Sequence, residues 1–183
     1  MSERARLLEL FTRLAYEKRK VVLSSGRESD FYIDTKQASL TAEGHYLVGR
    51  LVLAEIRKHY PSAKGVGGMT MGADPIASAV SLSSFLSEPP GIPGFYVRKE
   101  PKGHGTAQWI EGRKSLPAGT EVAIVEDVVT TGASTIKAVD RVRAEGLVAL
   151  GVVALVDREE GGREAVLAHG VPVVSLFKRS DFP

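Results

Sequence analysis

The chain has 183 residues, enough for one domain that buries about 70% of the surface its unfolded form exposes. Its net charge is +2, with 43% hydrophobic and 25% charged residues, which is not the strongly basic balance of a nucleic-acid-binding domain. The absence of cysteine excludes disulfides, thiol nucleophiles and zinc sites built on thiolates, and no apolar run approaches the length of a membrane span. We therefore expect a soluble, cytoplasmic protein that contacts neither membrane nor nucleic acid.

The first half of the chain predicts helices separated by one short strand. Residues 1–15 interleave charged and apolar side chains, as an amphipathic helix does. A second helix is predicted over residues 41–60, where Pro61 stops it. A strand near residues 64–68, a glycine-rich turn and a third helix over residues 75–86 follow.

The second half alternates apolar strands with helices, which favours a parallel sheet with helices on both faces. Residues 100–115 are polar and lack a helical or strand period, and so long a connection is usually functional or disordered. No repeat or linker interrupts residues 1–183, so we predict a single domain. The strands are expected at 94–98, 121–126, 147–157 and 171–177, and the helices at 133–145 and 163–169.

The most specific segment is residues 122–135, where an apolar strand ends in Glu126 and Asp127 and a hydroxyl-rich turn opens a helix. Gly132 and the small Ala133 let backbone amides approach a phosphate, and the helix N-terminus adds partial positive charge. The two adjacent carboxylates would repel each other unless ribose hydroxyls and a nearby magnesium ion were bound there. Read alone, the segment has a less favoured alternative, a capped helix after a solvated strand end. The turn's hydroxyl donors are Thr130, Thr131, Ser134 and Thr135.

This order of two acids, two further residues and Thr-Thr-Gly resembles the ribose-phosphate signature of the type I phosphoribosyltransferases. The turn lacks the lysine of a Walker loop and also differs from G-x-G-x-x-G. The resemblance implies an α/β fold in which helices flank a parallel sheet and a small N-terminal hood, about residues 1–40, covers the base site. It also implies that Mg²⁺ is held mainly by the diphosphate substrate, with no direct protein ligand. The residues implied to bind 5-phosphoribosyl 1-diphosphate here are Glu126, Asp127, Val128, Val129, Thr130, Thr131, Gly132, Ala133 and Ser134.

Two further segments resemble the base site of the orotate phosphoribosyltransferases. Residues 25–34 contain an aromatic pair, Phe31 and Tyr32, which the resemblance places against the pyrimidine, although such a strand read alone is more often core. Residues 155–162 resemble the segment whose arginine recognises orotate; a guanidinium such as that of Arg158 suits a planar carboxylate. Without the resemblance, Asp-Arg-Glu-Glu usually forms a solvated strand end. The implied orotate-binding residues are Phe31, Tyr32, Thr130 and Arg158.

Residues 98–105 resemble the mobile catalytic loop of the same enzymes, although a loop of this kind read alone is an ordinary basic surface loop. Cations that arrive with a closing loop would neutralise the departing diphosphate and exclude water. The resemblance implies that Arg98, Lys102 and His104 act on the diphosphate of their own subunit. It implies that Lys99 acts on that of a neighbour, and therefore a homodimer. The implied catalytic residues are Lys99, Lys102, His104 and Asp127.

Three segments depart from the family pattern. Residues 67–74 occupy the place of the diphosphate loop, but Met71 and Gly72 stand where some orotate enzymes have lysine. Ser24 stands where some members have a lysine, and the first signature acid is Glu126 rather than aspartate. Backbone amides of the glycine-rich turn could still bind phosphate oxygens.

The sequence therefore predicts transfer of a phosphoribosyl group to N1 of orotate, giving orotidine 5′-phosphate and diphosphate in pyrimidine synthesis. One alternative keeps the reaction and changes the base to a purine or another pyrimidine. Another is a non-catalytic regulator that senses phosphoribosyl diphosphate. The near-neutral charge and the lysine-containing loop favour the enzyme.

Overall fold

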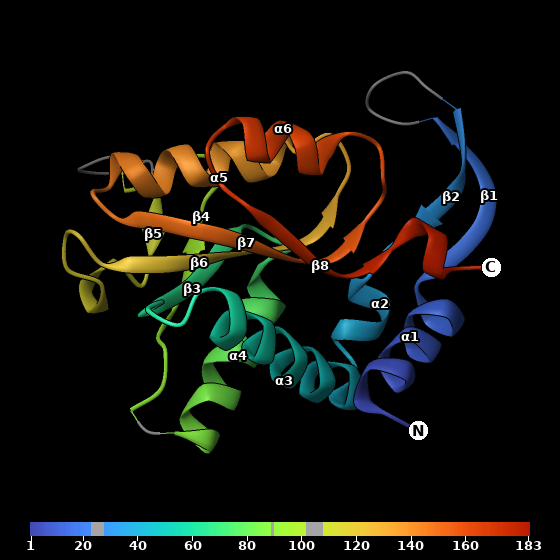
Figure 1. The fold of residues 1–183 in the computed structure, drawn as a ribbon, viewed down its shortest axis with the longest axis horizontal. Helices are drawn as coiled ribbons and strands as arrows, with labels where there is room; N and C mark the ends of the chain where they lie inside the picture. The colour runs from blue at the N-terminus through green and yellow to red at the C-terminus, as the bar shows by residue number, and fades with distance from the viewer. Residues whose placement is uncertain (23–27, 89, 102–107) are drawn as a thin grey trace.

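The computed structural model describes residues 1–22, 28–88, 90–101 and 108–183 (Figure 1). Its centre is a six-stranded sheet in the order β5-β4-β3-β6-β7-β8. Every neighbouring pair is parallel except β4 and β5, which are antiparallel, so the predicted parallel sheet is confirmed. The strands are β3 (Gly65–Met69), β4 (Gly94–Val97), β5 (Ile110–Glu111), β6 (Glu121–Val129), β7 (Val148–Asp157) and β8 (Val173–Lys178).

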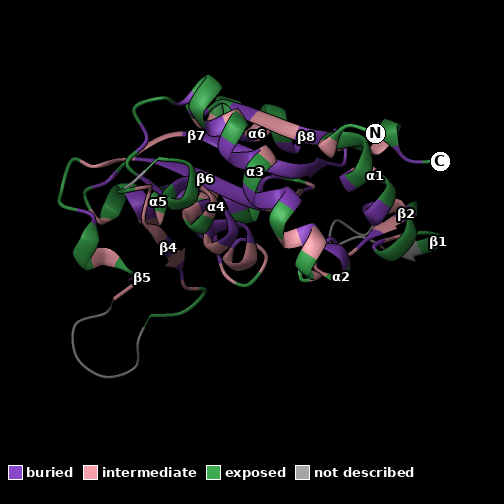
Figure 2. Cartoon of the chain, turned by 90° about the horizontal axis from the view of Figure 1, so that it is seen from below, coloured by how far each residue is buried: buried purple, intermediate pink, exposed green. Residues whose placement is uncertain are grey.

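Helices cover both faces of the sheet. Helices α3 (Ala42–His59) and α4 (Asp74–Ser87) lie on one face, and α5 (Ala133–Ala144) and α6 (Gly162–Ala168) lie on the other (Figure 1). Each face has its own hydrophobic core, so the central strands are buried on both sides (Figure 2). This double burial explains the unbroken apolar runs of the central strands, because strands of such sheets have no solvent face that needs polar residues.

The N-terminal segment forms a unit beside the carboxyl ends of β7 and β8, and its buried residues share one hydrophobic core with α3 and β7 (Figure 1). It consists of helix α1 (Glu3–Leu14), an antiparallel pair of strands, β1 (Tyr16–Val22) and β2 (Glu28–Ile33), and the short helix α2 (Lys36–Ser39). An aromatic cluster joins this unit to the C-terminus, where the ring of Phe31 packs against Tyr16 and Phe182 at centroid distances of 5.2 and 5.6 Å. The last element is a 3-10 turn, η2 (Arg179–Asp181).

The structure corrects the sequence reading at two places. Strand β6 was expected to end at Glu126, but it continues to Val129 because Val128 and Val129 pair with Val156 and Asp157 of β7. The polar segment 100–115 contains strand β5 and a 3-10 turn, η1 (Arg113–Ser115). Both elements are too short to produce a helical or strand period in the sequence. The other predicted elements agree with the structure to within two residues at each end. Within the described residues, no helix is long and apolar enough to span a bilayer.

Candidate active site

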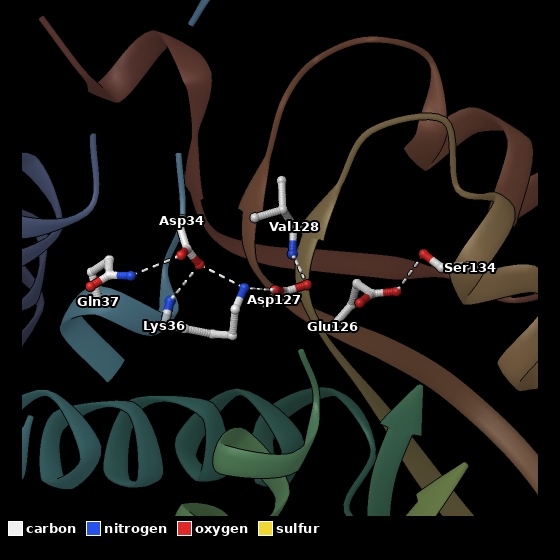
Figure 3. Close-up of polar contacts among 7 residues, drawn as sticks. All are labelled: Asp34, Lys36, Gln37, Glu126, Asp127, Val128 and Ser134. Atoms are coloured by element: carbon white, nitrogen blue, oxygen red, sulfur yellow. Dashed lines mark hydrogen bonds and ion pairs between the residues drawn. The ribbon is translucent and has the colours of Figure 1, made fainter. Parts of the chain in front are cut away.

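Glu126 and Asp127 leave β6 on opposite faces, because successive side chains of a strand alternate, but their carboxyl groups share a hydrogen bond and line one cavity at the end of the strand (Figure 3). Glu126 faces α5, and its Oε2 accepts hydrogen bonds from Ser134 Oγ at 3.0 Å and Thr135 Oγ1 at 2.8 Å. Asp127 lies on the other side of the strand, where its Oδ1 accepts the Val128 amide at 2.8 Å. The pair therefore faces two different environments.

Burial determines the protonation of Glu126, whose side chain is 4% exposed. Burial and the neighbouring charge of Asp127 raise the pKa of Glu126 from 4.5 to about 8, although the hydroxyl of Thr135 opposes the shift. Glu126 is therefore largely protonated at neutral pH when no ligand is bound.

On the other face, a lysine that the sequence reading missed approaches Asp127. The Lys36 Nζ lies 2.6 Å from Asp34 Oδ1 and 3.6 Å from Asp127 Oδ2 (Figure 3). Burial lowers the pKa of Lys36, but the two carboxylates outweigh it and the net shift is upward. Burial likewise raises the pKa of Asp34, and the bonds from Lys36 and Gln37 outweigh it to give a net lowering. Both groups are held in their charged forms.

A cavity of about 350 Å³ opens between these charged groups and the turn from β3 to α4. The turn lies close to Asp127 because Gly72 has no side chain. A Cβ at position 72 would lie 2.5 Å from the Asp127 carboxylate. The cavity is lined by Lys36, Met69, Thr70, Met71, Gly72, Lys99, Glu126, Asp127 and Ser134. It lies at the carboxyl edge of the sheet, where ligands of such folds bind.

The predicted phosphate turn is fixed by the loop after β7. Gly132 caps α5 with φ +79°, a conformation that favours glycine. A Cβ on Gly162 would lie 2.5 Å from the carbonyl oxygen of Thr130, and the Arg158 amide donates to the Val129 carbonyl at 3.0 Å. Thr131, Ala133 and Ser134 are exposed at the start of α5, as a phosphate site requires.

Thr135 differs from the other hydroxyl residues of the turn. It is fully buried, and its hydroxyl donates to Glu126. The expectation that Thr135 adds a donor for phosphate is therefore wrong, because helix geometry turns position 135 toward the sheet rather than toward the turn.

Two of the predicted base-site residues, Phe31 and Arg158, meet where β2 approaches the end of β7. Arg158 is buried; its Nη2 donates to the Phe31 carbonyl at 2.9 Å and its Nε lies 3.0 Å from Glu160 Oε1. Phe31 is 3% exposed within the aromatic cluster, whereas Tyr32 is half-buried with Arg19 stacked 4.0 Å from its ring centroid. The contacts of these residues with a base remain predictions.

The predicted catalytic loop is described only at its two ends. Arg98 pairs with Glu111 of β5 at 2.8 Å, and the exposed Lys99 lines the cavity of its own chain. The guanidinium of Arg141, on α5, donates to the carbonyl oxygens of Arg98 and Lys99 and stacks 4.1 Å from the Trp109 ring centroid. This role of Arg141 could not be predicted from the sequence. Lys102 and His104 lie outside the described residues.

The described residues contain no cluster of three or more His, Cys, Asp or Glu side chains that could hold a metal ion. Two carboxylates nevertheless face the cavity region, and burial holds one of them, Glu126, in its protonated form. Such a donor set fits a hard cation that is also ligated by substrate oxygens.

Comparisons with known proteins give the class and then the particular family. Residues 66–171 match the model of the phosphoribosyl transferase domain family, so the chain is a member of that family. It is 53% identical to the orotate phosphoribosyltransferase of Sorangium cellulosum, over 99% of this chain and 93% of that protein. It is 50% identical to that of Aquifex aeolicus, over 87% and 84% of the two chains.

Solved structures agree with these relatives. The orotate phosphoribosyltransferase of Mycobacterium tuberculosis, in complex with Fe(III) dicitrate, superposes with a TM-score of 0.81 at 40% identity and covers 98% of both chains. Another structure of that protein, with a TM-score of 0.76 and 37% identity over 98% of both chains, contains 5-phospho-alpha-D-ribosyl 1-diphosphate. The chain belongs to the orotate phosphoribosyltransferases.

Proposed function

We propose that the carboxyl edge of the sheet binds 5-phosphoribosyl 1-diphosphate and orotate and joins them into orotidine 5′-phosphate, with release of diphosphate, as a step of pyrimidine synthesis. The observation that carries this proposal is one arrangement: the open N-terminus of α5 adjoins two acids of β6 beside a cavity. The turn residues 130–134, of which Thr131, Ala133 and Ser134 are exposed, suit the 5-phosphate, since helix N-termini bind anions. Glu126 and Asp127 suit the ribose hydroxyls, which can donate to carboxylates.

The reaction needs no covalent nucleophile. As the bond between the anomeric carbon and the diphosphate oxygen breaks, positive charge develops on the ribose and negative charge on the diphosphate. N1 of orotate, used as an anion after its proton is lost to solvent, forms the new bond. Catalysis then consists of positioning and of charge stabilisation. Asp127 lies where it can hold the ribose, while Arg98, Lys99, Lys102 and His104 supply positive charge for the diphosphate. Arg141 holds the carbonyls at the start of that segment.

We propose Mg²⁺ as the cofactor, bound mainly through substrate oxygens. When bound, it would neutralise the diphosphate and so favour its departure. Glu126 and Asp127 are the side chains that fit its surroundings, and Glu126 would release its proton as positive charge arrives.

Orotate is proposed to lie between the N-terminal hood, residues 1–40, and the end of β7. Arg158 supports this because a guanidinium fork can bind a carboxylate, a group that other nucleobases lack. Phe31, Tyr32 and Thr130 are the other residues proposed for the base, and the half-buried ring of Tyr32 is the more accessible of the aromatic pair. The hood and the sheet together are proposed to form one domain.

A homodimer with Lys99 acting across the interface completes the proposal. Support comes from an apolar surface on α3 and α4, where Tyr46, Leu82, Phe85 and Leu86 are each more than half exposed. Apolar groups gathered in this way commonly mark protein interfaces. A location in the cytoplasm stays a prediction from the absence of cysteine and of a long apolar run.

The test of the function is orotate consumption, followed by ultraviolet absorbance with phosphoribosyl diphosphate and magnesium, beside parallel reactions with uracil, hypoxanthine and adenine. Turnover of orotate alone is expected. Turnover of another base would overturn the assignment of Arg158 and leave the phosphate site standing. Binding of phosphoribosyl diphosphate without any turnover would favour the regulator.

The dimer proposal has its own test. Lys99→Ala chains and Asp127→Asn chains, each nearly inactive alone, should regain activity when mixed and allowed to exchange subunits. Each mixed dimer would then contain one site with an intact Asp127 and an intact Lys99. Absence of recovery, with exchange verified by a mass tag, would contradict a lysine that acts across the interface.

A further inference from the structure

We propose that Lys36 is a further substrate-binding residue, whose ammonium group supplies a fixed positive charge to phosphoribosyl diphosphate at the wall of the cavity. The inference rests on the function proposed above and deepens it. It assigns a binding role to a residue outside the phosphate turn, the loop at residues 98–105 and the base site.

The first argument is the position of the ammonium group. Lys36 opens α2, and its side chain reaches across to the opposite element, β6, where it lines the cavity with the turn from β3 to α4. Asp34 holds the group at 2.6 Å, whereas Asp127 lies at 3.6 Å, beyond a strong hydrogen bond. An ammonium group has three donors, so donors remain for the oxygens of a ligand near Asp127.

The second argument is the balance of charge around the cavity. Its described lining contains two carboxylic acids, and its only lysine, arginine or histidine residues are Lys36 and Lys99. The turn at residues 69–74 carries no basic side chain, and Met71 is exposed there. Phosphoribosyl diphosphate carries several negative charges, and Lys36 is the only basic residue of this described lining besides Lys99, which is proposed to act on the neighbouring subunit.

The third argument is preorganisation. Asp34 accepts hydrogen bonds from the Lys36 amide at 3.3 Å and from Gln37 Nε2 at 3.1 Å, and it binds the Lys36 ammonium group as well. This arrangement fixes the lysine before the substrate arrives, which reduces the side-chain entropy lost on binding. Asp34 is thus a positioning residue that acts through Lys36.

The competing explanation is that Lys36 is only a tether between the N-terminal unit and β6. If Lys36 were only a tether, its loss would lower stability, and a positive charge placed elsewhere in the cavity would not restore binding. A ligand contact would affect affinity for the anionic substrate, and a lysine on a neighbouring wall could replace it in part. Met71 provides that wall, because it is 68% exposed and lines the same cavity.

The experiment measures binding of magnesium–phosphoribosyl diphosphate by calorimetry without a base, together with orotate turnover. Lys36→Met, which preserves length but removes charge, should weaken binding about tenfold, and Lys36→Arg should retain most of the affinity. Adding Met71→Lys to Lys36→Met should restore part of the loss. Lys64→Met is the matched control and should leave binding unchanged. Lys64 is exposed and precedes β3, at the end of that strand away from the cavity.

Three outcomes decide the matter. Affinity within twofold of the wild type in a folded Lys36→Met protein would overturn the proposal. Equal losses in Lys36→Met and Lys36→Arg, with lowered melting temperatures and no rescue by Met71→Lys, would show a tether and also overturn it. Failure of the wild type to consume orotate, with the predicted binding changes intact, would instead overturn the proposed function and support Lys36 as a ligand contact.

Discussion

The negative charges of Glu126 and Asp127 are reduced in different ways on the two faces of β6. On the α5 face, the hydroxyls of Ser134 and Thr135 surround Glu126, and burial favours its protonated form. On the opposite face, Asp127 meets a lysine from a segment 91 positions earlier in the chain. The hydrogen-bond partners of Glu126 come from its own sequence motif, whereas the lysine beside Asp127 comes from a distant part of the chain.

This difference shows how one strand can hold two carboxylates at a site for an anionic substrate. Two ionised carboxylates side by side would repel the phosphate groups as well as each other. A proton on one acid and a lysine beside the other reduce that repulsion in the free protein. Ribose hydroxyls and a cation can then replace the proton when the substrate binds.

The largest effect is expected from breaking the Asp127 face. Asp127→Asn should lower kcat/KM by at least about 100-fold, because it removes a charged contact to the ribose and changes the partner of Lys36. Glu126→Gln should cost less, about tenfold, since a neutral side chain already occupies that face in the free protein. Steady-state kinetics with both substrates varied would measure this, and equal losses for the two variants would contradict the difference between the faces.

The next effect concerns stability and applies to the Glu126 face. Because the folded pKa of Glu126 lies above 4.5, its stabilising contribution is complete below that pH and is lost as pH rises through about 8. Glu126→Gln, which has no such loss, should therefore be more stable than the wild type by several kcal/mol at pH 8.5. Urea unfolding should give that difference at pH 8.5 and almost none at pH 4.5; a constant difference would contradict the shift.

A smaller effect should follow from disturbing the phosphate turn on the α5 side. Gly162→Ala places a Cβ 2.5 Å from the Thr130 carbonyl oxygen, so the turn must move and affinity for phosphoribosyl diphosphate should fall about tenfold. Gly161→Ala is the matched control: a Cβ there meets nothing within 4 Å, although its φ of +88° costs some stability. Calorimetry on both variants would compare them, and an unchanged affinity in Gly162→Ala would show that the turn tolerates the shift.

The smallest effect is expected away from both acids, at Arg141. Arg141→Met removes the donors to the carbonyls of Arg98 and Lys99 but retains an apolar contact with Trp109. We expect turnover to fall about threefold to tenfold while affinity for orotate changes little, because positioning of the catalytic segment is affected rather than the base site. A variant with unchanged turnover would show that these backbone contacts do not contribute.

A functional residue could be predicted from the sequence where the residues that it contacts lie close to it along the chain. The phosphate turn could be predicted, because strand, acids, hydroxyls and helix follow each other within residues 122–135. The division of the two acids between faces required the knowledge that β6 runs on to Val129, and this depends on pairing with β7.

Residues whose partners are distant could not be found in this way. Lys36 gave no signal, since Asp34-Thr35-Lys36 reads as an ordinary polar connection until α2 is placed against β6. Arg141 is one of three basic residues within residues 133–144, and nothing in the sequence distinguishes it from the other two. The burial of Phe31 against Phe182 likewise depends on the C-terminus folding back onto the N-terminal unit.

Titration of Glu126 tests the difference between the faces most directly. Carbon-13 NMR of the glutamate side chains, with the Glu126 signal assigned by its loss in Glu126→Gln, gives the pKa in the ligand-free protein. We predict a midpoint near 8, lowered when magnesium–phosphoribosyl diphosphate binds. A midpoint near 4.5 in the free protein would contradict the account, because both faces of β6 would then carry a charged carboxylate before the substrate arrives.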